Sequence, residues 1–64
     1  MNAEDATVRW HADQINKMSS KQAEYYMTRL YGEMNRVYAE TGDELIKIAH
    51  ERIRERLQEI VNCK

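Results

Sequence analysis

The stretch RVYAETGDELIK, residues 36–47, decides how this chain folds, because the repeat of apolar residues changes register within it. The repeat that leads up to Val37 would continue onto Glu44, which is acidic, so the same helix face cannot stay apolar. Two interpretations are open. Either Gly42 ends a helix, and Thr41 forms a capping box with Glu44 to start the next one, or one long helix runs through with a kink. A lone interior Gly costs a helix only about 1 kcal/mol relative to Ala.

The composition predicts a single all-α domain. The chain has 64 residues, no proline and only two glycines, and it is rich in Ala, Glu, Gln, Arg and Met, which favour helices. So short a chain buries only about 60% of its unfolded surface, and a partner subunit is the usual remedy. The net charge is −1 and the charged residues are mixed in sign, which is typical of solvated helix faces. We therefore expect no binding to nucleic acid.

The first segment has apolar residues at i, i+4, i+7 and i+10, the spacing of one helix face: Val8, Ala12, Ile15 and Met18. This spacing predicts a helix over about residues 3–18, with Asn2 as its N-cap. Ser19 has the features of the next N-cap, because Gln22 stands three residues on and completes a capping box. A turn at residues 18–20 is so short that it predicts an antiparallel helical hairpin.

The second segment repeats apolar residues at alternating spacings of four and three, with a tyrosine beside them: Ala23, Tyr26, Met27, Leu30, Met34 and Val37. This repeat predicts a long helix over about residues 20–62, with a possible kink at 41–43. We expect these residues and the first-segment stripe to form the core and a homodimer interface. The tyrosines point in several directions around the helix, so some of them must face a second subunit or another partner.

The residues that could carry chemistry are sparse. The adjacent serines, the single Cys63 and the two histidines show no spacing that recurs in enzymes, so we expect no enzyme. Neither His11 nor His50 has a second ligand at metal-binding spacing, so we expect no metal and no cofactor. One cysteine and no long apolar run predict a cytoplasmic protein without membrane insertion. Trp10 lies off the core stripe, as a partner contact or as part of a subunit interface.

The run VRWHADQINKMSSKQAEYYMTRLYGEM, residues 8–34, resembles NblA, a family of small phycobilisome degradation proteins of cyanobacteria, red-algal plastids and some cyanophages. Residues 44–47, ELIK, resemble the Glu-Leu-Leu-Lys near the end of the family's long helix. The resemblance covers roughly forty residues. The positions that carry it are Arg9, Ala12, Gln14, Ile15, Met18, Ser19, Gln22, Ala23, Tyr26, Met27, Arg29, Leu30, Tyr31 and Met34.

The resemblance implies a hairpin of a short first and a long second helix, paired as a homodimer into an open four-helix bundle. It also implies an adaptor without chemistry of its own, which binds phycobiliproteins, phycocyanin or related antenna subunits, and delivers them to a Clp-type chaperone-protease. Such an adaptor works in the cyanobacterial cytoplasm, at the thylakoid-associated phycobilisome. Gly42 and Asp43 have no counterpart in the family's continuous long helix.

The resemblance also implies a place for the partner. In the family, the C-terminal half of the long helix recognises the antenna, which indicates Leu45, Ile46 and Lys47 here. Trp10 is a further candidate contact because tryptophan is enriched in binding hot spots. If the helix is continuous, Leu45 extends the core face, and Ile46 and Lys47 turn about 100° and 200° away from it. We then expect Ile46 and Lys47 to face the partner.

An alternative interpretation is a Rop-like helical hairpin dimer, or a phage antirepressor, that binds RNA or a regulatory protein. A basic stripe on one face would favour the RNA-binding version. Instead, Lys21, Arg29, Arg36 and Lys47 are scattered, with acidic residues between them. This pattern ranks the alternative behind the adaptor.

Overall fold

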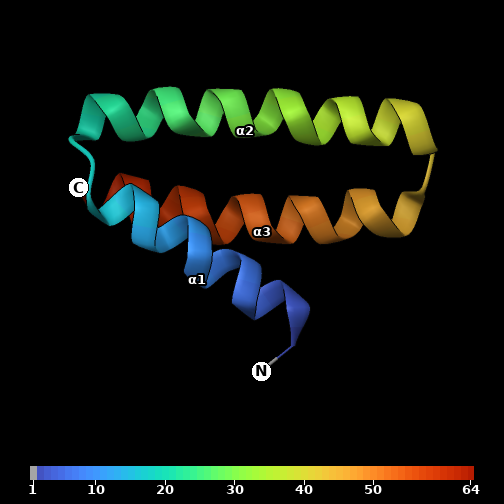
Figure 1. The fold of residues 1–64 in the computed structure, drawn as a ribbon, viewed down its shortest axis with the longest axis horizontal. Coiled ribbons are helices and arrows are strands. Elements are labelled where there is room, and N and C mark those ends of the chain that lie inside the picture. The colour runs from blue at the N-terminus through green and yellow to red at the C-terminus, as the bar shows by residue number, and fades with distance from the viewer. Residues whose placement is uncertain (1) are drawn as a thin grey trace.

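The computed structural model describes residues 2–64, which form three α-helices (Figure 1). They are α1 (Ala3–Asn16), α2 (Ser20–Thr41) and α3 (Glu44–Asn62). α2 and α3 run antiparallel side by side, and α1 crosses α3 at an angle (Figure 1). The predicted all-α class is confirmed.

α1 begins where the sequence predicts. The side chain of Asn2 accepts a hydrogen bond of 2.8 Å from the backbone N–H of Asp5, so Asn2 is the N-cap. The helix ends at Asn16, two residues before the predicted end. Lys17 and Met18 donate their N–H groups to carbonyls three residues back, which tightens and closes the last turn.

α2 begins with the predicted capping box. The backbone N–H of Gln22 donates to Ser19 Oγ at 3.2 Å, and the backbone N–H of Ser19 donates to Gln22 Oε1 at 3.1 Å. Each side chain thus satisfies a backbone donor that the first helical turn leaves without a partner. The predicted roles of Ser19 and Gln22 are confirmed.

We expect Ser19→Ala to lower the free energy of unfolding by about 0.5–2 kcal/mol, because it removes the acceptor at the start of α2. Chemical unfolding followed by circular dichroism measures this loss. Ser20→Ala is the matched control: Ser20 is exposed and lies inside the helix, so its loss should stay below about 0.5 kcal/mol. Equal losses in the two variants would contradict the assignment of Ser19 as the cap.

The chain breaks at Gly42. The backbone of Gly42 has φ 62° and ψ 18°, the left-handed conformation that ends many helices, and its N–H donates to the carbonyl of Tyr38 at 2.7 Å. Glycine adopts this conformation without the steric penalty that a Cβ brings. Of the two interpretations of this stretch, the true break is confirmed, and the continuous helix over residues 20–62 is wrong.

The cap of α3 differs from the predicted one. Asp43 Oδ1 accepts from the N–H groups of Leu45 at 2.9 Å and of Ile46 at 3.4 Å, so Asp43 is the N-cap. The capping box predicted for Thr41 is wrong: Thr41 is the last residue of α2, its hydroxyl donates to the carbonyl of Val37, and its oxygen accepts from the N–H of Asp43 instead of Glu44. A threonine in the last turn of a helix can bond the preceding turn, and this competes with capping the next helix.

The break changes which helices pack together. The sequence predicts that the first and second helices pair directly, but both pack against α3 and barely contact each other. α3 packs against α1 and α2 through Ile53, Leu57 and Val61, which are spaced four residues apart. Seven buried residues form one cluster: Val8, Ile15, Ala23, Met27, Ile53, Leu57 and Val61. The first four of them were predicted as core residues.

Candidate binding surfaces

The half of the α2–α3 hairpin near Gly42 is incompletely covered. α1 has 14 residues and α2 has 22, so α1 is about 21 Å long against about 33 Å. A groove of about 410 Å³ lies between α1 and this half of the hairpin, and α1 contributes Ala3, Glu4, Thr7 and His11 to its wall. We call it the hinge groove, and α2 and α3 contribute six apolar residues to its lining: Leu30, Met34, Val37, Ile46, Ala49 and Ile53. All of these except Ile53 are only half-buried, so the groove exposes apolar surface.

The predicted core residues divide between two environments. Ala12, Met18, Tyr26, Leu30 and Met34 are half-buried and pack against the core cluster. Val37 is half-buried in the hinge groove. The role of these residues in a homodimer interface stays a prediction.

The predicted partner residues are oriented differently from the expectation for a continuous helix. Leu45 is 77% exposed, whereas Ile46 is half-buried and lines the hinge groove. α3 is a separate helix after Gly42, so its buried residues, and not the register of α2, set how it is rotated about its own axis. Ile46 lies about 20° from Leu57 around the helix, and Leu45 about 120°. The expectation that Ile46 faces outward and Leu45 inward is therefore wrong.

Leu45 has an apolar neighbour that the sequence analysis missed. Ile48 follows one helical turn later and is 49% exposed, so the two side chains form what we call the Leu45–Ile48 patch. A helix that begins at Asp43 would have indicated Ile48 by its spacing of three residues from Leu45.

Tyr38 ties the two sides of the break together. Its hydroxyl donates to Glu44 Oε1 at 2.6 Å, and this bond to a carboxylate raises the pKa of Tyr38. The ammonium of Lys47 lies 5.1 Å from the centroid of the Tyr38 ring, within the range of a cation–π contact. Lys47 is exposed, but its contact with Tyr38 holds the side chain against α2.

An aromatic row links the middle of α1 to the first half of α2. Trp10 is 60% exposed and its ring meets His11 edge-on, with centroids 5.0 Å apart. His11 Nδ1 is hydrogen-bonded to the hydroxyl of Tyr26. Burial lowers the pKa of His11 and raises the pKa of Tyr26, so burial favours the uncharged form of both groups.

Two ion pairs join α1 to α3. Arg52 pairs with Glu4 at 3.1 Å and Arg56 with Asp5 at 2.7 Å. Exposed pairs of this kind contribute at most about 1 kcal/mol each, so they orient α1 more than they stabilise it. Nothing in the sequence spacing predicts them, because the partners are far apart in the chain.

Residues 2–64 contain no group of three or more His, Cys, Asp or Glu side chains that could hold a metal ion. In the same residues, no helix combines the length and the apolar composition that crossing a bilayer requires. The exposed apolar patch, the hinge groove and the aromatic row are features suited to binding other proteins. Comparison with protein families, with curated proteins and with solved structures finds no match to this chain.

Proposed function

We propose that this protein is a small adaptor that binds phycobiliproteins and promotes disassembly of the phycobilisome and its proteolysis by a Clp-type chaperone-protease. The observation that carries the proposal is the resemblance of residues 8–34 to NblA. These residues form most of α1, the capped turn and the first part of α2. The proposed place of action is the cyanobacterial cytoplasm, at the thylakoid-associated phycobilisome.

The Leu45–Ile48 patch is the proposed contact with the antenna. Leu45 belongs to the ELIK segment that resembles the recognition end of the family's long helix, and it is the most exposed large hydrophobic side chain in residues 2–64. Ile48 adds apolar surface at the same place. Two adjacent apolar anchors at the centre of a contact can supply most of its binding energy.

We expect the double substitution Leu45→Ala and Ile48→Ala to abolish co-sedimentation of the purified protein with phycobilisomes. Losing an anchor at a hot spot costs about 1–2 kcal/mol or more, so two losses weaken binding by roughly thirtyfold to several hundredfold. Helicity and the thermal midpoint should stay close to those of the parent, because both side chains are exposed.

Trp10→Ala is the comparison variant, because Trp10 is similarly exposed but lies on α1. If Trp10→Ala removes co-sedimentation and the double variant keeps it, recognition belongs to α1. If the parent protein itself does not sediment with phycobilisomes at micromolar concentration, the adaptor proposal fails.

The adaptor acts as a homodimer in this proposal. The hinge groove leaves Leu30, Met34 and Ile46 half-buried, and a second copy laid across it would cover them. Each copy would contribute α2 and α3, so that four helices surround the joined grooves. A chain of 64 residues has a small core, so burial of this surface would add substantially to its stability.

We expect the thermal midpoint to rise with protein concentration over a roughly hundredfold range, because dimerisation stabilises only the folded state. Met34→Glu should remove this dependence, since it places a carboxylate in the groove that the second copy would cover. Glu40 is exposed on α2 and does not line the groove, so Glu40→Gln is the control that should keep the dependence. A midpoint that does not change with concentration in the parent protein would exclude the dimer.

A further inference from the structure

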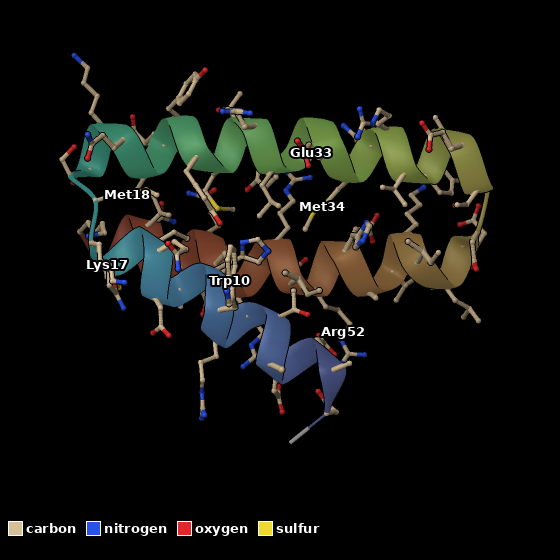
Figure 2. All side chains as sticks on the ribbon, viewed as in Figure 1. Trp10, Lys17, Met18, Glu33, Met34 and Arg52 are labelled. Carbon is tan, nitrogen blue, oxygen red and sulfur yellow. The ribbon has the colours of Figure 1, made fainter. Side chains whose placement is uncertain are left out.

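A second groove runs along the first half of α2, at the end of the hairpin away from Gly42. It has a volume of about 600 Å³ and begins at Met18, in the turn between α1 and α2 (Figure 2). Its lining contains two cationic side chains and no carboxylate: Met18, Ser19, Lys21, Gln22, Tyr25, Tyr26 and Arg29. We call it the turn groove.

The turn groove has an aromatic floor of one exposed and one half-buried tyrosine. Tyr25 is 66% exposed, and Tyr26 beside it is held in place by its hydrogen bond to His11. Trp10, labelled on α1 in Figure 2, extends this row through its edge-on contact with His11. A tyrosine ring with its polar tip suits a surface that another protein covers, because it gives apolar contact area with little loss of side-chain entropy.

The charges of the turn groove are unbalanced within the chain. The ion pairs among residues 2–64 join α1 to α3, and neither includes Lys21 or Arg29. Lys64 adds a third cation at the turn, where its ammonium donates to the carbonyl of Met18 at 2.8 Å. A chain with net charge −1 thus concentrates positive charge at one groove. Such a groove attracts acidic segments and repels basic ones.

We infer that the turn groove binds a short acidic segment of another protein that carries an apolar or aromatic anchor. The carboxylates of the segment pair with Lys21 and Arg29, and the anchor packs on Tyr25 and Tyr26. Arginine suits this role because its guanidinium can hold a carboxylate through two parallel hydrogen bonds.

The turn groove and the Leu45–Ile48 patch lie at opposite ends of a molecule whose longest dimension is 34 Å. One chain can therefore hold two different proteins at once. The inference goes beyond the proposed binding of phycobiliproteins and does not depend on it. It stands on the aromatic floor and the unpaired cations of the turn groove.

Fluorescence polarisation with two labelled synthetic peptides tests the inference. One peptide is composed of Glu, Leu and Phe, and the other has Lys in place of every Glu. We expect the acidic peptide to bind at least about tenfold more tightly than the basic one, and its binding to weaken as salt rises. Equal binding of the two peptides, or no saturation of the acidic one at millimolar protein, would overturn the inference.

Variants then locate the contact. Tyr25→Ala, Lys21→Glu and Arg29→Glu should each weaken binding of the acidic peptide by about tenfold or more, with helicity unchanged because all three side chains are exposed. Arg9→Glu is the control for the charge reversals, because Arg9 is exposed on α1 and outside the groove. Losses as large in Arg9→Glu would show that net charge, rather than the groove, attracts the peptide.

The occupant is tested in the same variants. If Tyr25→Ala abolishes self-association of the protein, a second copy fills the turn groove and the inference is wrong. Co-sedimentation with phycobilisomes should persist in Tyr25→Ala. A loss of both peptide binding and co-sedimentation would instead assign the groove to the phycobiliprotein. If only the variant with Leu45→Ala and Ile48→Ala loses co-sedimentation, the two surfaces bind different proteins, as the inference requires.

Discussion

Leu57→Ala should lower the free energy of unfolding by about 2–5 kcal/mol, the largest effect that we expect from a single conservative change in this chain. Leu57 is fully buried, in the cluster where residues of α1, α2 and α3 meet. The substitution removes three carbons from a fully buried site and leaves a cavity. A domain of 64 residues has a total stability of only about 3–10 kcal/mol, so this loss is a large fraction of the total.

Leu45→Ala is the matched control, because it makes the same change in the same helix at a side chain that is 77% exposed. Its effect should stay within about 0.5 kcal/mol. Urea unfolding followed by far-ultraviolet circular dichroism, at one protein concentration for both variants, measures the difference. Similar losses would mean that α3 does not pack through Leu57 in solution, and the three-helix arrangement would be wrong.

Gly42→Ala should destabilise the protein by about 1–2 kcal/mol, the cost of placing a Cβ in the left-handed conformation. Gly42 has φ 62°, and an added Cβ would meet no atom within 4 Å. The loss would therefore come from backbone strain and not from a clash. Thermal and chemical unfolding measure it.

Gly32→Ala should instead raise the free energy of unfolding. Gly32 lies in the interior of α2 with helical backbone, and an added Cβ also meets nothing within 4 Å. Alanine there should stabilise the helix by up to about 1 kcal/mol. If Gly42→Ala also stabilised the protein, α2 and α3 would form one helix in solution. Small-angle scattering would then show a particle well beyond the 34 Å of the folded-back chain.

The starts of the helices could be predicted from the sequence because each depends on a few neighbouring residues. Asn2 and Ser19 have the right side chains to accept from the next helical turn, and both do so. The start of α3 was harder. Thr41 and Asp43 are both capping residues, and the choice between them depends on whether Thr41 belongs to the preceding helix.

The candidate partner surface was only partly predictable. The ELIK segment pointed to Leu45, Ile46 and Lys47, but which of them faces outward depends on the rotation of α3. The burial of Ile53 and Leu57 sets that rotation, so Leu45 is exposed and Ile46 faces the hinge groove. The sequence repeat before Gly42 could not give this orientation. Gly42 has a left-handed backbone and ends α2, so the spacing of apolar residues in α2 does not continue into α3.

The sequence by itself determined the helical class, the capped turn at Ser19 and the apolar stripes of the first two helices, because these depend on propensity, capping and spacing within a few residues. Only the tertiary structure decided what the stripes pack against. Val8, Ile15, Ala23 and Met27 would suit any apolar helix face, whether from each other, from a second copy or from α3. Apolar contact has no direction and selects no partner by itself. The turn at Gly42 brings α3 back within reach, and that proximity made α3 the partner.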